Sequence, residues 1–333
     1  MPVIETPYLL FLGDVPDQLA AKTAQGVVHW RPESCVGQLR LPGCKADVGL
    51  PELSIEAGAA AGARTLLVGV ANAGGVLPPH WVANIVEAIE AGMDVASGLH
   101  MRLGDVPEIA AAAGRKGARL HDVRHPTRTF ATGKGTKRSG KRLLAVGTDC
   151  SCGKMYTTLA LEREMRARGL PADFRATGQT GILITGEGVS IDAVVSDFIS
   201  GAVEWLCPAN DPDHWDIVEG QGSLFHPSFA GVSLGLLHGA QPDLLVLCHE
   251  PTRTHMRGLP HQKLPGLEEC LERNLEAARL TNPAVRPLGV SINTAALDEA
   301  GARECMAEIE QALGLPTVDA FRTGVARLVD AIP

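Results

Sequence analysis

The chain has 333 residues, of which 45% are hydrophobic and 20% are charged, with 37 Gly and 22 Pro. This composition is typical of a loop-rich α/β protein of about two domains, and it excludes a disordered chain. A net charge of −8 argues against a role on nucleic acid or on a membrane surface, because binding to phosphate backbones normally requires a basic excess, so small molecules are the expected partners.

Residues 1–7 contain no basic start, long apolar core or cleavage site, so we expect no secretory signal. No apolar run approaches the roughly 20 residues of a membrane helix. The eight cysteines are scattered along the chain, which predicts reduced thiols in the cytoplasm rather than a disulfide framework.

The first 130 residues alternate short apolar runs with Ala-rich helical stretches. This alternation predicts βαβ units around a parallel sheet. The expected elements lie at 8–12, 66–70, 82–90, 94–97 and 107–113. Three segments of this domain could line a crevice, although their residues first of all suit turns. They are 31–35, 72–75 and 97–100.

Residues 131–142 are rich in Gly, Lys and Arg and show no apolar period. Such a stretch is typical of a solvated linker. A basic run can instead bind phosphate or nucleic acid, but no aromatic residue is interleaved here. The sequence therefore predicts one domain at 1–130 and a second at 143–333.

The second domain opens with an apolar run at 143–146, a glycine-flanked loop and a helix at 154–168. A strand, a loop closed by Gly-Lys and a helix form a P-loop, which points backbone N–H groups and an ammonium at bound phosphate. The expected cofactor-binding residues are Gly147, Thr148, Asp149, Cys150, Ser151, Cys152, Gly153, Lys154, Met155 and Tyr156.

Two features distinguish this loop from the usual pattern of four residues between the glycines and a Ser or Thr after the lysine. Five residues separate Gly147 from Gly153, and Met155 follows the lysine. The hydroxyl at that position binds Mg²⁺ in nucleotide hydrolases. The later Thr157 and Thr158 point elsewhere on the helix, although one of them could reach a phosphate. We therefore expect a phosphorylated ligand without Mg²⁺-driven phosphoryl transfer.

Cys150 and Cys152 form a single Cys-x-Cys pair, which is weak evidence for zinc. Small side chains in a tight loop explain this pair better, so we predict no metal.

Glu219 follows a predicted strand at 217–218 and precedes a Gly-rich turn that contains Gly222 and Ser223. At the carboxyl edge of a parallel sheet, this side chain would face the crevice beside the P-loop. It could hold a metal, a water or a substrate amine, or it could cap the next turn. His226 is a candidate acid or base, although a lone histidine is as often structural.

Two more segments are candidates for substrate binding. Gln179 and Thr180 lie in a Gly-rich stretch that suits either a ligand-embracing loop or an ordinary surface loop. Arg253 and Arg257 follow a predicted strand at 244–248, with Arg175 behind them. Arginine pairs bidentately with carboxylates, so these side chains suit an anionic substrate or a structural ion-pair network.

The remaining pattern predicts a strand at 288–292 and helices at 267–280 and 299–313. The second domain is therefore also expected to be α/β.

The motifs Gly-Thr-Asp-x-x-x-Gly-Lys and Val-Glu-Gly-x-Gly resemble the P-loop branch that includes dethiobiotin synthetase, which normally has Thr after the lysine. A closer resemblance is to a bacterial family formerly of unknown function. It rests on Gly-Thr-Asp-Cys-x-x-Gly-Lys-Met, Thr-Gly-Gln-Thr-Gly and Glu-Gly-Gln-Gly-Ser at 147–155, 177–181 and 219–223. This resemblance spans the whole chain and implies an N-terminal Rossmann-like parallel-sheet domain and a C-terminal P-loop NTPase-like α/β domain.

Some members of that family are D-glutamate N-acetyltransferases that use acetyl-CoA in D-amino-acid catabolism. The resemblance therefore implies acetyl transfer to the amino group of an amino acid, with D-glutamate as the expected substrate. Two alternatives stay open at this point: an ATP- and Mg²⁺-dependent kinase or carboxylate ligase of the dethiobiotin-synthetase type, and a non-catalytic nucleotide-sensing protein. We also expect a homo-oligomer.

Acetyl transfer needs a base that removes a proton from the substrate ammonium. Glu219 is the first candidate and His226 the second. The backbone N–H groups of Gly222 or Ser223 could stabilise the oxyanion. The glutamate carboxylates need cationic partners, for which Arg253, Arg257 and then Arg175 are the candidates.

Overall fold

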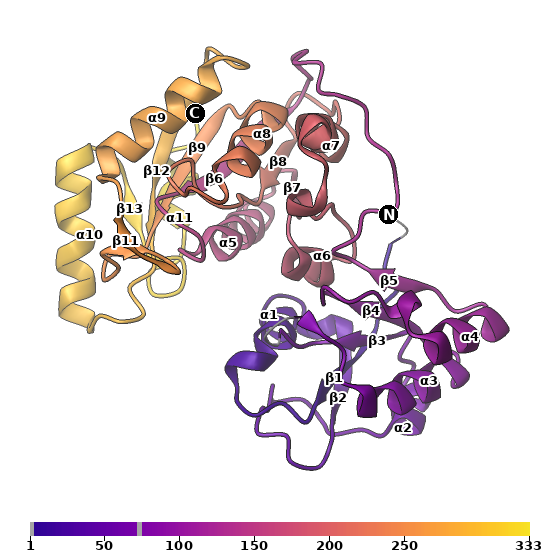
Figure 1. Cartoon of the computed structure of the whole chain (residues 1–333). Coiled ribbons are helices and arrows are strands. Elements are labelled where there is room, and N and C mark those ends of the chain that lie inside the picture. The colour runs from indigo at the N-terminus through magenta and orange to yellow at the C-terminus, as the bar shows by residue number, and fades with distance from the viewer. Residues whose placement is uncertain (1–2, 72–74) are drawn as a thin grey trace. The chain divides into compact units, whose positions relative to one another are not determined.

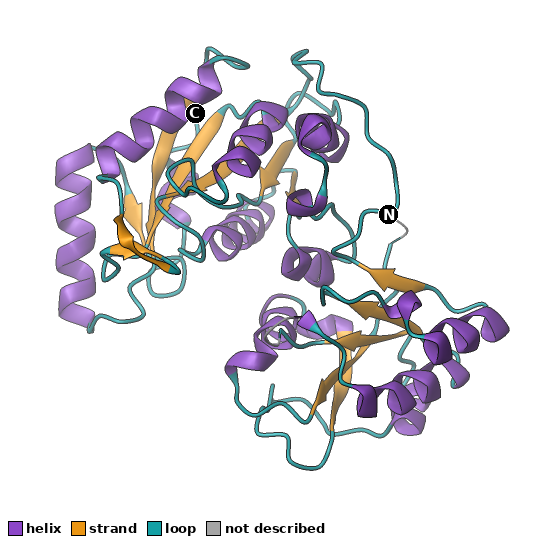
Figure 2. Ribbon diagram, viewed as in Figure 1, coloured by secondary structure: helices purple, strands orange, loops and turns teal. Residues whose placement is uncertain are grey.

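The computed structural model describes residues 3–71 and 75–333 and divides into two compact units. Unit 1 contains the chain up to Thr129 and the segment Gly178–Ala193, and unit 2 contains Phe130–Thr177 and Val194–Pro333. Each unit is a parallel β-sheet with helices, as predicted (Figures 1 and 2). Most of the predicted turn at 72–75 lies outside the described residues. Within the described ranges, the helices are too short or too polar to cross a bilayer.

Unit 1 is built on a five-stranded parallel sheet with the strand order β2-β1-β3-β4-β5. This is the order of a doubly wound fold, in which apolar strands are covered on both faces. The strands are β1 (Tyr8–Gly13), β2 (Cys35–Arg40), β3 (Thr65–Val68), β4 (Asp94–Ser97) and β5 (Leu120–Asp122). The helices are α1 (Lys22–Trp30), α2 (Ile55–Ala60), α3 (Val82–Glu90), α4 (Pro107–Lys116) and α6 (Gln179–Thr185).

Helix α6 belongs to unit 1 although it lies between two strands of unit 2 in the sequence. A Cβ on Gly26 of α1 would lie 3.5 Å from Thr180 Cγ2, and Ile4 N donates to Gly186 O at 2.8 Å. The predicted continuous domain at 143–333 therefore differs from the structure at this segment. An apolar helical pattern specifies a helix, but it does not specify which core the helix covers.

Unit 2 is built on a six-stranded parallel sheet with the order β13-β12-β9-β6-β8-β7. The strands are β6 (Lys141–Gly147), β7 (Ala172–Arg175), β8 (Trp215–Val218), β9 (Leu244–His249), β12 (Arg286–Ile292) and β13 (Thr317–Val318), beside a β10 (His255–Met256) and β11 (Leu259–Lys263) hairpin. The helices are α5 (Lys154–Ala167), α7 (Ile199–Leu206), α8 (Ala230–Ala240), α9 (Leu267–Arg279), α10 (Glu299–Leu313) and α11 (Ala326–Asp330).

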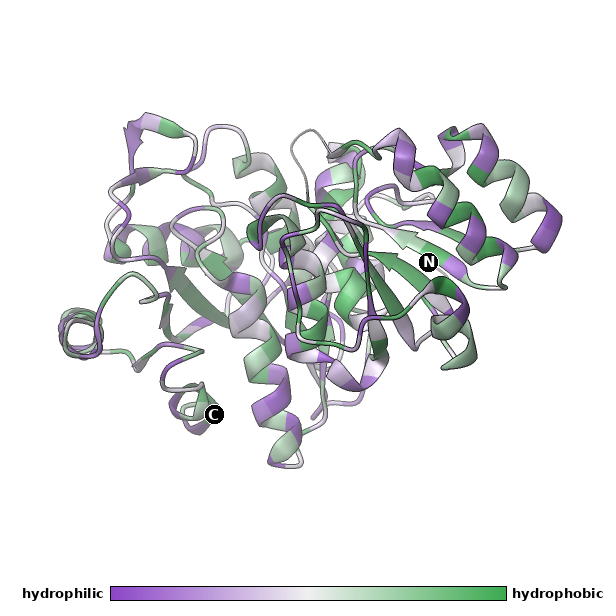
Figure 3. Cartoon of the chain, turned by 90° about the horizontal axis from the view of Figure 1, so that it is seen from below, coloured by the Kyte–Doolittle hydropathy of each residue, from purple (hydrophilic) through white to green (hydrophobic). Residues whose placement is uncertain are grey.

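Hydrophobic residues concentrate in the strands of both sheets, whereas the helices carry both hydrophobic and hydrophilic residues (Figure 3). The strands predicted at 143–146, 217–218, 244–248 and 288–292 are confirmed, as are the helices at 154–168, 267–280 and 299–313. The apolar pattern alone does not predict β2, β5 and β13, because β2 is only half-buried and the other two strands are very short.

The end of the basic run at 131–142 is not a solvated linker. Arg142 lies in β6 and is fully buried, and its Nη2 donates to Ser139 O at 2.7 Å. Arg138 donates to Cys207 O and Gly239 O at the carboxyl ends of α7 and α8, both at 2.7 Å. Carbonyls at helix ends lack intrahelical donors, so this guanidinium anchors the run to unit 2.

Candidate P-loop site

The candidate site lies where β6 sits between β8 and β9, because the order of connections in the sheet reverses there. Open parallel sheets bind their ligands at such a reversal, beside the carboxyl ends of the strands. Thr148 follows β6, and its carbonyl accepts a hydrogen bond from Ser223 Oγ at 3.2 Å. Its hydroxyl lies 2.9 Å from Nδ1 of His249, the last residue of β9. Three segments singled out in the sequence therefore meet at one sheet edge.

The loop after β6 has the backbone of an anion-binding turn. Ser151 and Gly153 both have left-handed conformations, with φ of 53° and 105°. Helix α5 begins at Lys154, and Gly153, its N-cap residue, provides no side-chain cap. Successive N–H groups in such a turn face one concavity, and the helix dipole adds positive potential there. The predicted P-loop geometry is therefore present.

Lys154 is only 6% exposed, and its side chain lies inside this loop. Its Nζ donates to Asp149 O at 2.7 Å and lies 3.6 Å from Cys152 Sγ. A Cβ on Gly220 would lie 2.9 Å from Lys154 Cδ and 1.7 Å from Ala145 O, so only glycine allows this close approach. The turn after β8 thus presses the lysine stem against β6 and holds the ammonium at the loop.

Asp149 is fully buried and braces the loop through three N–H donors. They are Arg253 Nη1 at 2.6 Å, Arg257 N at 2.8 Å and Cys150 N at 2.7 Å. Burial acts to raise the pKa of Asp149, but the hydrogen bonds from Arg257, Arg253 and Cys150 outweigh it and hold the pKa below its usual value. The carboxylate is therefore ionised at neutral pH.

The structure brings Arg253 and Arg257 to the P-loop, where they contact protein groups. Arg253 pairs with Asp149 and, at 3.1 Å, with Glu250. Arg257 Nη1 donates to the hydroxyl of Ser151. Arg253 is thus an internal brace of the loop, and a carboxylate-binding role for either arginine stays a prediction.

The hydroxyl groups around the loop are already engaged. Thr157 Oγ1 lies 2.8 Å from Ser291 Oγ, and Thr158 Oγ1 donates to Lys154 O at 2.9 Å. Ser151 accepts from Arg257, and Thr148 bonds His249. With Met155 after the lysine, the loop resembles an anion cradle more than a Mg²⁺-nucleotide site.

Glu219 is buried directly after β8. Its Oε2 accepts the N–H of Thr177 at 2.9 Å, and its carbonyl accepts the Thr177 hydroxyl at 2.7 Å. Gln221 Nε2 donates to the same hydroxyl at 3.1 Å. Thr177 opens the motif at 177–181 but was not predicted as a site residue, and it fixes both the carboxylate and the Gly-rich turn.

That turn continues through Gly222, whose φ is 58°, to Ser223 and His226. His226 donates its backbone N–H to Ser223 O at 3.1 Å, and its ring stacks on Phe229 with centroids 4.4 Å apart. The imidazole is therefore held rigidly at the sheet edge.

Asp149, Cys150 and His226 form the one cluster of potential metal ligands in the described ranges, with ligand atoms within 4.8 Å of one another. Two observations make this set poorly suited to a cation. Asp149 already accepts three N–H donors, two of them from arginines. Burial raises the pKa of Cys150, which disfavours the thiolate that metals prefer.

The other predicted substrate-binding residues lie in different surroundings. Gln179 and Thr180 belong to α6 of unit 1, and a Cβ on Gly98 would lie 3.3 Å from Gln179 Cγ. Arg175 Nε donates to Asp216 Oδ1 at 2.7 Å. Ligand roles for these three residues stay predictions.

Tyr156 in the first turn of α5 contacts Phe321, a residue that the sequence pattern does not single out. Their ring centroids lie 4.9 Å apart, and Phe321 is 63% exposed. The contact joins segments that are far apart in the sequence, so no local motif could reveal it.

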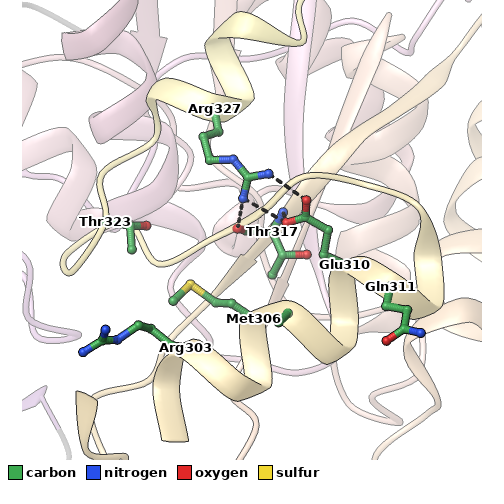
Figure 4. Close-up of a pocket in the computed structure, with 8 residues that line it drawn as sticks. Arg303, Met306, Glu310, Gln311, Thr317, Thr323 and Arg327 are labelled. Atoms are coloured by element: carbon green, nitrogen blue, oxygen red, sulfur yellow. Dashed lines mark hydrogen bonds and ion pairs between the residues drawn. The ribbon is translucent and has the colours of Figure 1, made fainter. Parts of the chain in front are cut away.

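A separate groove of about 500 Å³ lies between α10, β13 and α11. Figure 4 shows Arg327 and Glu310 facing each other across it, with N–O distances of 2.6 and 2.9 Å, while Arg303 points away. Because Glu310 already pairs with the Arg327 guanidinium, we interpret this groove as a gap between packed helices and not as an anion-binding site.

A parallel sheet whose central strand leads through a Gly-rich loop to a helix with a buried lysine defines a P-loop α/β protein, here joined to a second parallel-sheet unit. Residues 129–329 match the family described as "Domain of unknown function (DUF1611_C) P-loop domain", and residues 39–126 match the "DUF1611_N" Rossmann-like domain. The chain belongs to the DUF1611 family, and the predicted combination of a Rossmann-like and a P-loop domain is confirmed.

Two curated relatives carry the name D-glutamate N-acetyltransferase. The protein from Tritonibacter scottomollicae is 56% identical over 330 residues, which is 99% of each chain. The protein from a Pseudoalteromonas species is 53% identical over 326 residues, which is 98% of each chain. A crystal structure of a DUF1611 family protein from Anabaena variabilis matches with a TM-score of 0.85 at 32% identity, covering 98% of this chain and 99% of that one. The sequence-based family resemblance is therefore confirmed.

Proposed function

We propose that this chain transfers an acetyl group from acetyl-CoA to the amino group of D-glutamate. Two relatives that carry the name of this activity are more than half identical to the chain over nearly its full length. The strand–loop–helix arrangement of a P-loop supports this, because β6 ends at Gly147 and α5 begins at Lys154.

The observation that carries the proposal is a P-loop that has a buried lysine but no hydroxyl after it. Coenzyme A bears a pyrophosphate and a 3′-phosphate, which backbone N–H groups and Lys154 can cradle without a metal. An ATP-dependent kinase or ligase needs a hydroxyl for Mg²⁺, whereas Met155 occupies that position and Thr157 and Thr158 bond protein groups. The chemistry of the loop therefore favours binding of CoA over binding of Mg²⁺-ATP.

Glu219 is the proposed base, because the substrate ammonium must lose a proton before its nitrogen attacks the thioester. The Thr177 N–H orients its carboxylate at the sheet edge, beside the glycine that contacts the Lys154 stem. As the sequence suggested, the backbone N–H groups of Gly222 and Ser223 are proposed to donate hydrogen bonds to the oxyanion.

Arg257 is the preferred partner for a substrate carboxylate. Its side chain bonds the neutral hydroxyl of Ser151 and makes no ion pair with a carboxylate of residues 3–71 and 75–333. Arg253 and Arg175 already pair with aspartates, so they are less suited to this role.

A thiol-release assay tests the proposal. Acetyl-CoA is mixed with D-glutamate, L-glutamate or other amino acids, once with EDTA and once with Mg²⁺-ATP. We expect free CoA with D-glutamate in EDTA. The proposal fails if no amino acid releases CoA, and ADP formation in Mg²⁺-ATP would then support the kinase or ligase alternative. Cytoplasmic location and self-association stay predictions from the sequence.

A further inference from the structure

The imidazole of His226 carries a hydrogen-bond donor that the protein does not use. The side chain is only 2% exposed, and its Nδ1 accepts the N–H of Ser228 at 3.2 Å. A neutral imidazole that accepts at one nitrogen carries its proton on the other. Nε2 therefore bears the N–H, and no acceptor for it exists within the described part of the chain.

This buried donor lies at the P-loop. A ring nitrogen of His226, Cys150 Sγ and an Asp149 carboxylate oxygen are all within 4.8 Å of one another. The ring is fixed by stacking on Phe229 and by the Ser228 N–H at Nδ1. The N–H groups of Phe229 and Ala230 donate to His226 O at 3.0 Å and fix its backbone. A buried N–H held this rigidly suits an acceptor atom that arrives with a ligand.

The tautomer separates three roles for His226. A metal needs a lone pair, but the Nδ1 lone pair is used by Ser228 and Nε2 carries a proton. A general base needs the same free lone pair. A hydrogen-bond donor needs only the Nε2–H, which is the group that the fold leaves available.

We propose that His226, whose Nδ1 accepts from Ser228, donates its Nε2–H to the carbonyl oxygen of the acetyl thioester during transfer, a role that rests on the proposed function. The amine nitrogen bonds the carbonyl carbon, and the π electrons move to the oxygen that His226 stabilises. They return as the C–S bond breaks and CoA leaves. The substrate ammonium loses two protons: the first passes through Glu219 to solvent before the attack, and the second passes through Glu219 after the attack and ends on the CoA sulfur. His226 keeps its own proton throughout.

The first test compares kcat with CoA affinity in the full-length protein. His226→Phe keeps an aromatic ring against Phe229 but removes the N–H. We expect kcat to fall on the order of 10²-fold, as for loss of one oxyanion donor, with the calorimetric Kd for CoA within twofold of wild type. His226→Gln retains a side-chain N–H and should recover part of the loss.

A matched control is His238→Gln in α8, where the histidine bonds Ala277 O at 3.1 Å. This variant should retain wild-type kcat. Weakened CoA binding with unchanged kcat in His226→Phe would instead show that His226 holds a phosphate, and it would overturn the proposal. If kcat and the Kd for CoA are both unchanged in His226→Phe, the proposal is also overturned.

A second measurement does not depend on activity. ¹⁵N NMR of histidine-labelled protein, with His226→Gln used to assign the signal, should show a ring protonated at Nε2 and not at Nδ1 at neutral pH. The opposite tautomer, or stoichiometric metal bound to the purified protein, would refute the donor role. Wild-type protein that releases no CoA with D-glutamate would refute the proposed function itself, whatever the tautomer.

Discussion

The first strand of each unit ends in a glycine and is soon followed by an aspartate, yet the two ends differ in chemistry. In unit 1, Asp14 after β1 accepts from Trp81 Nε1 at 2.8 Å, and His80 Nε2 lies 3.0 Å from its other oxygen. A Cβ on Gly13 would lie 2.2 Å from the Trp81 ring, which is almost fully buried. An aromatic ring therefore fills the space beside this strand end.

In unit 2, the corresponding space is bounded by cationic and polar groups. Asp149 after β6 pairs with Arg253, and the ammonium of Lys154 bonds the Asp149 carbonyl. The loop leads through Gly153 directly to the N-terminus of α5. Both units place a strand end and an aspartate at the carboxyl edge of a parallel sheet, where such sheets bind ligands, but the side chains that cover the edge decide whether it can hold an anion.

The largest effect is expected for Glu219→Gln. Loss of the base should lower turnover with D-glutamate about 10²- to 10⁴-fold, because general base catalysis contributes that much. The Kd for CoA, measured by calorimetry, should stay at its wild-type value. Asp14→Asn, at the matching edge of unit 1, is the control and should keep full turnover. Equal losses of turnover and CoA affinity in Glu219→Gln would contradict the base assignment.

Lys154→Met should come next in size. Removing the ammonium loses charge-assisted hydrogen bonds worth about 1.5–3 kcal/mol, so CoA affinity should fall about 10- to 100-fold. Calorimetric titration with CoA measures this change. Lys116→Met in α4 of unit 1 removes the same charge and should leave the affinity unchanged. If both variants bind CoA as the wild type does, the P-loop is not the CoA site.

Asp149→Asn and Asp14→Asn compare the two strand ends directly. The amide accepts more weakly from Arg253 and from the Arg257 N–H, so the loop should loosen. We expect a loss of about 1 kcal/mol in CoA binding, on the order of fivefold in Kd, for Asp149→Asn alone. A similar loss in Asp14→Asn would show that the edge of unit 1 also contributes to CoA binding.

The smallest effect is expected for the pH dependence of folding stability. Burial lowers the pKa of His249 beside the P-loop, and it also lowers the pKa of His121 in unit 1. The unfolded chain, with a histidine pKa of about 6.5, then binds protons more readily than the folded protein does. Stability should be complete above pH 6.5 and fall as the pH drops toward the folded-state values.

Thermal melts between pH 8 and pH 5 measure this dependence. His249→Gln should flatten the part that belongs to unit 2, and His121→Gln the part that belongs to unit 1. Melting temperatures that rise on acidification below pH 6.5 would contradict the sign derived from burial.

Local sequence patterns predicted the elements that carry the site. The apolar run before Gly147, the Gly-Lys pair and the helix from Lys154 follow from steric and periodicity rules that act within a few residues. The same reasoning placed Glu219 and Arg253 at strand ends. In a parallel sheet the carboxyl ends of the strands lie at one edge, so the sequence alone indicated that these residues share that edge with the P-loop.

Only the tertiary structure decided what those residues contact. It showed that Arg253 braces Asp149, that Thr177 orients Glu219 and that Arg142 is buried. It also assigned α6 to unit 1. Charge, hydrogen-bonding capacity and helical periodicity are properties of single residues and short segments. The partner of each group depends on packing between segments that are distant in the sequence, and no local pattern encodes that packing.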